Sequence, residues 1–399
     1  MEKLAVFGGE PVRKTKLYYG HQYIDDADIE AVTKVLKSDY LTCGPEIAKL
    51  EQKLCDLTGA KYAVVCSNGT AALHMACQAA GLNIKDELIT TPITFAASAN
   101  CALYCGATPV FADIDPETYN ISPAEVEKKI TARTKAVVAV DFTGQAVELN
   151  KLTKICEDHK LVLIEDGAHS IGTSYEGKMI GSVADMTTFS FHPVKTVTGG
   201  EGGAVLTNNK DYYEKLLLFR AHGITRDPNQ LVRESAGPWY YEQIELGMNY
   251  RMTDIQAALI SSQLDKLDIF RARRKQIVKQ YDEAFSEIPE LFVQKEIPES
   301  DTTRHLYILR IRPEQLTIDR ADFFRYMEAE NICCNVHYIP VYYHPYYEKL
   351  GYHKGLCPES EKLYDTIMSL PLYYSLTDQD VSDVIRAVRK IVDNTRKGR

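Results

Sequence analysis

One lysine of this sequence, Lys195, lies between an aromatic run and a cluster of glycines. The aromatic run spans residues 189–191, and the glycines are Gly199, Gly200, Gly202 and Gly203. A lysine amine held in a site can form a Schiff base with a carbonyl cofactor. The alternative is an exposed loop lysine without a chemical role, because charged side chains are mostly solvated. The polar groups elsewhere in the chain have to decide between these two interpretations.

A carboxylate stands at the end of an apolar run upstream of this lysine. Residues 161–165 predict a buried strand, and Asp166 follows it directly. In open α/β sheets, ligands bind beyond the carboxyl ends of the strands. A carboxylate in that place can hold a protonated heteroaromatic nitrogen, as enzymes that use pyridoxal phosphate require. The alternative is that Asp166 only caps the segment that follows it.

A turn earlier in the chain has the composition of an anion site. Ser67–Thr70 follows the predicted strand 62–66 and opens a predicted helix. Backbone N–H groups at a helix N-terminus, with the hydroxyls of Ser67 and Thr70, are suited to bind a phosphate. A plain N-cap without a ligand is the alternative. The turn is not a Walker loop, and no GxGxxG motif follows an early strand.

Further residues suit the same ligand or a substrate beside it. Phe95 follows a strand and can stack on a flat ring, although such a residue is more often core. Asn249 and Arg251 offer an amide and a guanidinium to a phosphate, or lie on an exposed surface. His337 and Tyr338 precede a tyrosine-rich segment that suits a sugar or nucleotide surface, or equally a subunit contact. The tyrosines of that segment are Tyr342, Tyr343, Tyr346 and Tyr347.

Composition and charge limit the class of protein. The chain has 399 residues, 45% of them hydrophobic and 25% charged, which is ordinary for a soluble globular protein of two or three domains. The net charge of −9 argues against general nucleic-acid binding, but leaves room for a local cationic site. No apolar run approaches the ~18 residues of a membrane span, and the first residues do not open a signal peptide. We therefore expect a cytoplasmic protein without membrane or nucleic-acid partners.

The ten cysteines form neither a CxxC motif nor a tight Cys/His cluster in the sequence. Cys66, Cys77, Cys101 and Cys105 lie among apolar or small residues, which predicts buried thiols. The sequence thus favours neither a metal site nor a disulfide framework.

Strands and helices alternate over the first half of the chain. Solidly apolar strands that alternate with helices predict a mostly parallel sheet that is covered on both faces. The predicted strands span residues 62–66, 87–91, 108–113, 135–140, 161–165, 187–191 and 203–207. The predicted helices span residues 25–37, 46–58, 96–105, 123–130 and 149–158, and a further helix follows the turn 67–70 and includes residues 71–75.

The second half of the chain predicts a smaller unit. A long helix over 253–286 links it to the sheet, and strands are expected at 305–311 and 332–336, with helices at 320–330 and 378–392. We divide the chain into an irregular N-terminal arm (1–20), a large domain (21–270) and a small C-terminal domain (271–399).

The ordered motifs resemble one known family. Residues 67–70, 166–169, 190–195, 200–203 and 247–251 are similar to the motifs of the DegT/DnrJ/EryC1/StrS sugar aminotransferases. The resemblance covers about residues 19–392, nearly the whole chain. It implies an α/β protein of the fold type I pyridoxal phosphate aminotransferase architecture, with a seven-stranded, mostly parallel sheet and a smaller α+β C-terminal domain. It also implies a homodimer with shared active sites and no metal.

The resemblance assigns roles residue by residue. Lys195 corresponds to the Schiff-base lysine and general acid/base, Asp166 to the partner of the pyridinium nitrogen, and His169 to a residue near the ring oxygen. Gly69, Thr70 and Ser190 match contacts to the cofactor phosphate, Phe95 matches the ring-stacking position, and Asn249 matches a contact to the neighbouring subunit's phosphate. Arg251, His337 and Tyr338 are the expected substrate-binding residues.

The same resemblance predicts an activity. Residues 90–95, 139–144 and 335–340 are similar to those of the members that aminate a 4-keto sugar nucleotide in pseudaminic acid biosynthesis. We expect glutamate to be the amino donor and a UDP-linked 4-keto-6-deoxy N-acetyl sugar to be the acceptor. The alternatives are a 3-keto sugar aminotransferase, a deoxysugar dehydratase, and a non-enzymatic regulatory member. Because dehydratases of the family replace the lysine by histidine, Lys195 favours transamination.

The glycine cluster has one departure from the family pattern. Gly199 stands where relatives often carry threonine. We expect the four glycines to let the chain pass closely beside the phosphate and the ring of the cofactor.

Overall fold

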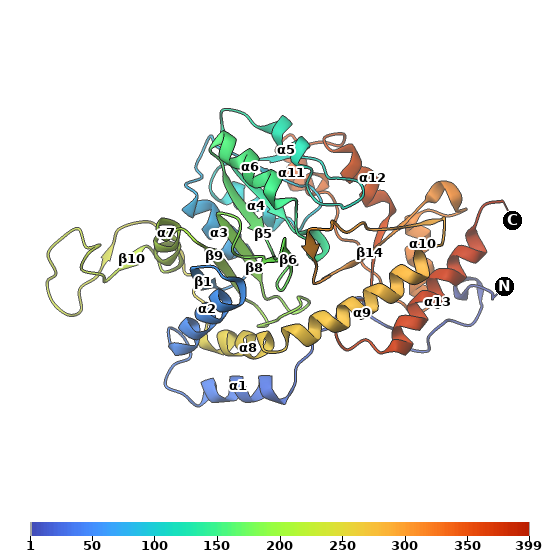
Figure 1. The fold of residues 1–399 in the computed structure, drawn as a ribbon, viewed down its shortest axis with the longest axis horizontal. Helices are drawn as coiled ribbons and strands as arrows, with labels where there is room; N and C mark the ends of the chain where they lie inside the picture. Colours follow the sequence, from blue (N-terminus) through green and yellow to red (C-terminus); the bar gives the residue numbers. More distant parts are fainter. Residues whose placement is uncertain (1, 399) are drawn as a thin grey trace.

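A seven-stranded sheet forms the centre of the molecule in the computed structural model, which describes residues 2–398 (Figure 1). The strand order is β1-β9-β8-β5-β4-β2-β3. β9 runs antiparallel to both of its neighbours, and the remaining pairs are parallel. The bounds are β1 (Tyr62–Cys66), β2 (Glu87–Thr90), β3 (Thr108–Phe111), β4 (Thr134–Val140), β5 (Val162–Asp166), β8 (Met186–Ser190) and β9 (Gly203–Thr207). The predicted fold class is confirmed.

Each face of the sheet has its own hydrophobic core, since successive strand residues point to opposite sides. Ile164 and its equivalents pack under α3 (Gly69–Ala79), α4 (Ala97–Tyr104) and α7 (Lys210–Arg220). Leu163 and its equivalents pack on the opposite side. The helices there are α2 (Pro45–Thr58), α5 (Pro123–Lys129), α6 (Leu149–His159) and α8 (Asp254–Leu264). Burial of both faces explains why these strands read as continuous apolar runs.

A second core lies around a small antiparallel sheet in the C-terminal part. The sheet order is β12-β14-β15, with β12 (Leu291–Val293), β14 (Tyr307–Ile311) and β15 (Ile367–Leu370). Helices α9 (Leu267–Phe285), α10 (Arg320–Ala329) and α13 (Asp378–Thr395) pack on it. Leu267 belongs to the first core and Ile277 to the second, so α9 passes from one to the other. The domain boundary at 270 stays a prediction.

The N-terminal segment lies against this second core. Leu4 and Leu17 are buried in it, and Leu17 bridges Ile332 in parallel. The segment contains one short 3-10 helix (Ala5–Phe7) and is otherwise irregular. The two ends of the chain lie close together at this end of the molecule (Figure 1).

The predicted single helix over 253–286 is wrong, because the helix is interrupted between α8 and α9. Lys266 leaves the helical conformation, with φ −102° and ψ 2°. Its ammonium group lies 2.8 Å from Asp25 and 2.7 Å from Asp28, at the start of α1 (Asp26–Leu36). Asp28 is fully buried, and a buried carboxylate needs a paired cation. The Lys266 ammonium group, at the interruption between the two helices, is that cation.

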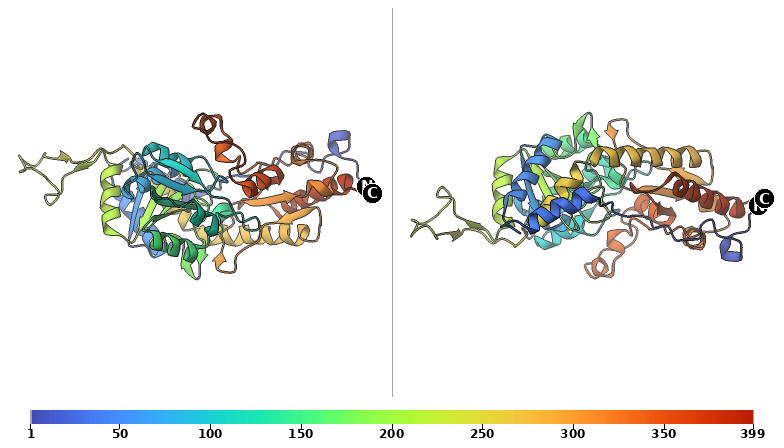
Figure 2. Two further views of the ribbon diagram at one scale, coloured as in Figure 1. Left: turned by 90° about the horizontal axis from the view of Figure 1, so that it is seen from above. Right: turned by 90° about the horizontal axis from the view of Figure 1, so that it is seen from below.

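A thin hairpin projects from the body of the molecule in all three views (Figures 1 and 2). It is built on β10 (Ile224–Thr225) and β11 (Glu242–Gln243), which pair antiparallel. Apolar side chains on it are exposed to solvent in the single chain, among them Trp239 and Leu246.

The remaining elements are short. The predicted strand over 332–336 is wrong: these residues form only single bridges, through Ile332 to Leu17 and through Asn335 to Ser369. The short elements are β6 (Ser174–Tyr175), β7 (Lys178–Met179), β13 (Ser300–Asp301), α11 (Pro345–Lys349), α12 (Pro358–Thr366) and the 3-10 helices Phe142–Gly144, Pro313–Gln315 and Val341–Tyr343.

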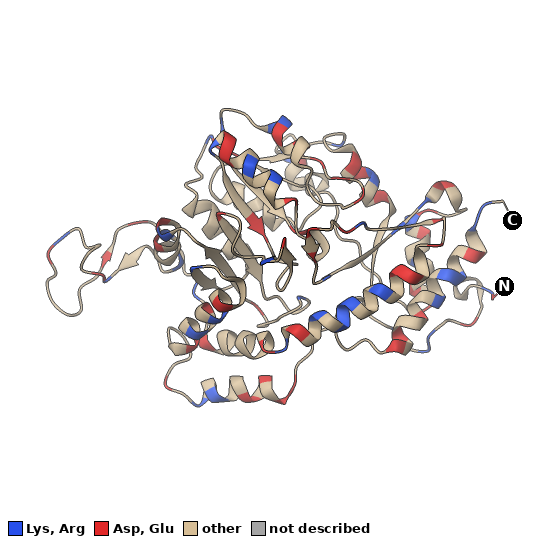
Figure 3. Cartoon of the chain, viewed as in Figure 1, with Lys and Arg blue, Asp and Glu red and all other residues tan. Residues whose placement is uncertain are grey.

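Charge is concentrated on the covering helices, where both signs alternate, and the central strands are mostly free of it (Figure 3). Within residues 2–398, no helix combines the length and apolar character that a membrane span needs. Nor does any cluster of His, Cys, Asp and Glu side chains in this range have the arrangement of a metal site.

Candidate active site

A cavity of about 1040 Å³ opens at the carboxyl ends of β5 and β8, beside the N-terminus of α3. It brings together residues that are far apart in the chain. The predicted residues that line it are Gly69, Thr70, Phe95, Asp166, His169, Ser190, Lys195, His337 and Tyr338. Its size exceeds what a single ring cofactor needs, so a second ligand has room beside the first.

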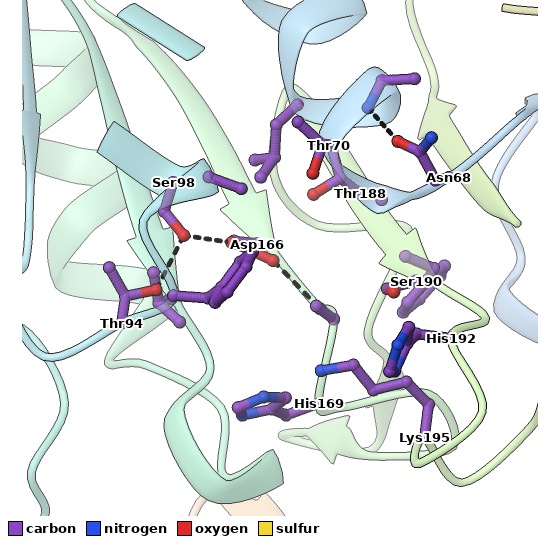
Figure 4. Close-up of a pocket in the computed structure, with 18 of the residues that line it drawn as sticks. Asn68, Thr70, Thr94, Ser98, Asp166, His169, Thr188, Ser190, His192 and Lys195 are labelled. Atoms are coloured by element: carbon purple, nitrogen blue, oxygen red, sulfur yellow. Dashed lines mark hydrogen bonds between the residues drawn. The ribbon is translucent and has the colours of Figure 1, made fainter. Parts of the chain in front are cut away.

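Lys195 extends into this cavity from the loop that follows β8. Figure 4 shows its amine end directed to the side on which His169 and Asp166 lie. The loop is held by the Lys195 backbone N–H, which donates to the His192 carbonyl at 2.9 Å. Burial lowers the pKa of the Lys195 amine to about 8, against the opposing effect of the Asp166 carboxylate. A neutral amine is therefore accessible near physiological pH, which an ordinary lysine does not provide.

Asp166 ends β5 and is held by a chain of hydrogen bonds. The Ser98 hydroxyl donates to Oδ2 of Asp166 at 2.7 Å, and the Thr94 and Ser98 hydroxyls lie 2.7 Å apart (Figure 4). The Ala168 backbone N–H donates to Oδ1 at 3.1 Å. Burial raises the pKa of Asp166, and the bonds from Ser98 and Ala168 and the charge of Lys195 act in the opposite direction. The carboxylate is thus oriented rigidly and has a cationic neighbour.

His169 lies beside Lys195 as a neutral imidazole. Burial, followed by the charge of Lys195 and by His337, holds the pKa of His169 well below its usual value. Its Nε2 lies 3.1 Å from the Tyr338 hydroxyl, and its ring is 4.5 Å from that of His305 between centroids. Its Nδ1 is buried and has no hydrogen-bond partner among the described residues. An unpaired buried polar atom at a pocket wall is the feature that a bound ligand satisfies.

The N-terminus of α3 forms an anion cradle at another wall. The Asn68 side chain caps the helix by accepting from the Ala71 N–H at 2.8 Å. The first N–H groups of a helix have no partner within it, and they face the pocket through Gly69 and Thr70. A Cβ on Gly69 would lie 2.8 Å from Cβ of Ser190, so glycine is needed for this close approach. The pocket is lined by Asn68 through Ala71 and does not include Ser67.

Aromatic side chains form the opposite wall. Phe95 is 61% exposed, and its ring lies 6.3 Å from that of Tyr338 between centroids. His337 is held by a 2.7 Å contact between Nδ1 and the Ser369 hydroxyl, and burial lowers the pKa of His337 to about 4. Tyr19, from the N-terminal segment, packs on His337 with ring centroids 5.4 Å apart. These groups offer flat surfaces and neutral polar atoms to a ligand.

A second pair of acids lies behind the pocket, on the other face of the sheet. Glu165 and Asp141 are fully buried. Burial raises the pKa of Glu165 to about 7, and burial together with the Glu165 charge raises the pKa of Asp141. Thr187 donates to Glu165 at 2.8 Å, and Ser170 donates to Asp141 at 2.5 Å. Ser170 follows His169, so Asp141 fixes the turn that presents the imidazole.

The glycine cluster has a different role from the one expected. Within residues 2–398 the pocket is lined by Glu201, but by none of the four glycines around it. A Cβ on Gly199 would lie 2.6 Å from Cγ1 of Ile260 in α8, and one on Gly203 would lie 2.4 Å from the Asn68 carbonyl. The glycines therefore let the lysine loop pack against α8 and against the anion turn, rather than against a ligand. Ile260 fills the space that a larger side chain at Gly199 would need.

The predicted roles of Asn249 and Arg251 stay predictions, and the tyrosine-rich segment has a different outcome. Asn249 and Arg251 do not line the pocket of this chain, although Met248 and Tyr250 do. Asn249 is exposed and bridges Ala221. The tyrosine-rich segment is largely core: Tyr342 and Tyr347 are buried around Phe111, and Tyr346 is exposed.

Several residues of the site were not predicted from the sequence. Ser98 and Thr94 support Asp166, and their spacing of four residues at the start of a helix was the available signal. His305 and Tyr19 reach the site from distant segments, and no local pattern marks them.

These features fit pyridoxal phosphate. The α3 N-terminus suits its phosphate, Asp166 its ring nitrogen, the unpaired Nδ1 of His169 a polar atom of its ring, and Lys195 its carbonyl. Sheet and site together define a pyridoxal phosphate-dependent aminotransferase. The family comparison agrees, since residues 22–389 match the model of the DegT/DnrJ/EryC1/StrS aminotransferase family. The chain belongs to this family.

Named relatives cover nearly the whole chain. The spore coat polysaccharide biosynthesis protein SpsC of Bacillus subtilis is 40% identical, over 94% of this chain and 97% of its own. The UDP-4-amino-4,6-dideoxy-N-acetyl-beta-L-altrosamine transaminase of Campylobacter jejuni (strain 81-176) is 36% identical, over 95% and 98%.

Solved structures of aminotransferases also superpose on nearly the whole chain. PseC of Helicobacter pylori, an aminotransferase of pseudaminic acid biosynthesis, superposes with a TM-score of 0.87 at 32% identity, over 95% of this chain and 100% of that one. The PLP-form of the sugar aminotransferase Spr1654 of Streptococcus pneumoniae superposes with a TM-score of 0.88 at 28% identity, over 95% and 99%.

Proposed function

We propose that this protein transfers the amino group of glutamate to a nucleotide-linked 4-keto-6-deoxy sugar, with a UDP-linked N-acetyl sugar as the favoured acceptor. The observation that carries the proposal is Lys195: a lysine with a lowered pKa, facing a buried carboxylate in a pocket too large for the cofactor alone. The sugar class is supported by the names of the Campylobacter transaminase and of PseC.

The cofactor would be held by groups on several elements. We assign its phosphate to Gly69, Thr70 and Ser190, and its ring nitrogen to Asp166. Phe95 would stack on the ring, and His169 would face its oxygen. When bound, pyridoxal phosphate supplies an electron sink that makes a C–H bond beside the amino nitrogen acidic.

Lys195 would move the proton. Its Nζ, about half of it neutral at pH 8, accepts a proton from Cα of glutamate and later returns one to the carbon that receives the amine. A cation that faces Asp166 favours the ionised form of its carboxylate against the effect of burial. His169 is neutral, so it adds no second positive charge that would oppose protonation of the Lys195 amine.

The acceptor sugar would lie against the aromatic wall. The buried His337 and the half-buried Tyr338 provide hydrogen-bonding groups at the pocket wall, which is suited to sugar hydroxyls and an N-acetyl group. Burial raises the pKa of Tyr338, so its hydroxyl remains a donor at working pH. Arg251 and Asn249 remain proposed ligand contacts.

A homodimer would bring Asn249 and Arg251 to an active site. Asn249 is exposed and outside the pocket of its own chain, as a residue that serves the neighbouring subunit's phosphate should be. We therefore propose shared active sites, with the large domain (21–270) as the main contact surface.

A substrate panel tests the proposal. Purified protein with pyridoxal phosphate and glutamate is incubated with 3-keto and 4-keto sugars linked to UDP or dTDP, and products are identified by mass. We expect an amino sugar from the UDP-linked 4-keto N-acetyl compound, and none with Lys195→Ala. Amination of a 3-keto sugar, deoxygenation without amine transfer, or cofactor binding without any product would each replace the proposed activity by one of its alternatives.

A further inference from the structure

A cluster of thiols lies where α3 and α4 pack against each other, next to His74, which also lines the pocket. Cys77 and Gln78 follow His74 by three and four residues on α3, so both lie next to His74 on the helix surface. Cys101 and Cys105 are four apart along α4 and its C-cap. The two helices pack against each other in the same core. Five polar or sulfur-bearing side chains therefore meet at one helix contact.

Cys105 is the accessible member of this cluster. It is half-buried between exposed neighbours, Tyr104 and Gly106, whereas Cys77 and Cys101 are buried. The Gln78 amide donates to its sulfur at 3.4 Å. The neighbouring Cys77 thiol and His74 imidazole lower the pKa of the Cys105 thiol against the effect of burial, while the pKa of Cys77 is raised by its two thiol neighbours and by burial. The negative charge of the cluster therefore resides on Cys105.

His74 is placed as the partner of that charge. It is only 4% exposed, and its Nδ1 lies 3.1 Å from the Tyr250 hydroxyl. Its other ring nitrogen, Nε2, is buried and lacks a hydrogen-bond partner among the described residues. An imidazole with one nitrogen fixed and the other unpaired beside a sulfur is the arrangement that stabilises a thiolate.

We propose that Cys105 is an oxidation site for peroxides, with Cys77 as the resolving thiol. The Cys105 thiolate attacks one peroxide oxygen: an S–O bond forms, the O–O bond breaks, and the leaving hydroxide takes a proton to become water. The Cys77 sulfur then attacks the Cys105 sulfenic acid: an S–S bond forms, the S–O bond breaks, and the second water leaves with the Cys77 proton. One peroxide is reduced to two waters, and two thiols are oxidised to one disulfide.

The proposed disulfide would connect two helices that also carry residues of the active-site pocket. α3 carries Gly69 and Thr70 at its other end, and α4 carries Ser98, which holds Asp166. The cross-link would join the two helices that form the anion cradle and the carboxylate support.

Peptide mapping of the oxidised protein tests the proposal. The full-length protein with bound cofactor is treated with one equivalent of hydrogen peroxide, blocked with iodoacetamide, and digested for mass spectrometry. We expect a Cys77–Cys105 disulfide that dithiothreitol reverses. Exposed Cys43 is the reference thiol in the same chain. Oxidation of Cys43 with Cys77 and Cys105 left free, or a bond between Cys77 and Cys101, would overturn the proposal.

Alkylation at two pH values tests the thiolate directly and needs no variant. Between pH 8 and pH 6 a thiol with the ordinary pKa of ~8.5 loses about 75-fold in rate, because its ionised fraction falls by that factor. We expect Cys105 to lose less than about fivefold. An equal loss at Cys105 and Cys43 would contradict a stabilised thiolate.

Variants separate the three roles. In Cys77→Ala, the Cys105 sulfenic acid should persist and be trapped by dimedone. In His74→Gln, alkylation of Cys105 at pH 6 should slow by about tenfold or more, because the stabilising charge is lost. Cys101→Ala is the matched control and should form the disulfide as the wild type does. Dimedone labelling of the wild type as strong as that of Cys77→Ala would remove the resolving role from Cys77.

Discussion

Strand β5 ends in two acids that meet opposite environments on the two faces of the sheet. Asp166 faces the pocket, where burial raises its pKa and the bonds from Ser98 and Ala168 and the charge of Lys195 act against that rise. Glu165 faces the other core, where burial raises its pKa to about 7. Neighbouring strand residues point to alternate faces of the sheet. Asp166 therefore lies at the pocket, and Glu165, the residue before it, lies in the core on the other face.

The comparison shows that the partners of a carboxylate, rather than burial alone, decide what it does. Both acids are buried, but Oε1 of Glu165 lacks a hydrogen-bond partner among the described residues, whereas both oxygens of Asp166 accept bonds. Desolvation of a charge is costly unless donors or an opposite charge replace water. Asp166 has both, whereas Glu165 is bonded by the Thr187 hydroxyl and the Gly181 backbone and has further acids beside it in place of a cation.

The largest expected effect comes from making the same chemical change on each face. Asp166→Asn should lower kcat by ~10²–10³, the size of effect seen when one preorganised electrostatic contact is removed. Glu165→Gln, its matched control, should stay within about threefold of the wild type, since it touches no ligand. Steady-state kinetics with glutamate and the accepted sugar measure both. Equal losses in the two variants would show that the faces do not differ as described.

The next effect concerns the reactivity of the Lys195 amine, which lies on the pocket side of the sheet. With a pKa lowered to about 8, its amine becomes neutral as pH rises through 8, and acetylation should be half-maximal there. At pH 8 its neutral fraction is ~100-fold larger than that of an ordinary lysine with a pKa of ~10.4. Acetic anhydride labelling of the cofactor-free protein, read by mass spectrometry, measures this. Lys34, 74% exposed, is the reference, and a shared pH profile would contradict the shift.

A smaller effect concerns stability and belongs to the buried face. Glu165 has a raised pKa in the folded state, so the folded protein binds its proton more tightly than the unfolded chain does. Stability from this group is therefore present at low pH and is lost as pH rises from ~4.3 to about 7. The loss is on the order of 2–3 kcal/mol. Urea unfolding of wild type and Glu165→Gln at pH 5 and pH 7.5 should show a smaller decline in the variant; parallel declines would assign the effect elsewhere.

The smallest effect tests the packing behind the lysine loop. Gly199→Thr should destabilise the protein by about 1–3 kcal/mol, because its Cβ overlaps Ile260. The cost should shrink in an Ile260→Ala background, where the space is open. Gly20→Ala is the control, since its nearest neighbour would lie at 3.7 Å. Chemical unfolding measures the wild type, the three single variants and the double variant, and additive costs in the double variant would mean that Ile260 does not set the glycine requirement.

Much of this architecture was predictable, because local patterns carried it. Continuous apolar strands gave the parallel sheet, and the residues that follow them, Asp166 and Gly69 among them, lie at one edge as parallel topology requires. The break at Lys266 was not predictable, since α8 and α9 together read as one periodic pattern and the break depends on buried Asp28 from a distant helix.

The rest of the site depended on contacts that sequence spacing does not encode. Tyr19 reaches the pocket, and His305 reaches His169 at its wall, by tertiary packing alone. The glycine cluster was predicted to approach a ligand, but its close neighbours are Ile260 and Asn68, which lie far away in sequence. Asn249 and Arg251 lie outside the pocket of their own chain, so a single chain does not test their predicted roles.

The most direct test of the central claim follows the proton that Lys195 should move. The holoenzyme is incubated with glutamate in D₂O, and loss of the Cα–H signal is followed by NMR. The account predicts exchange by the wild type at pH 8, slower exchange as pH falls, and none above background with Lys195→Ala. Exchange by Lys195→Ala at the wild-type rate would show that another group moves the proton and would contradict the account.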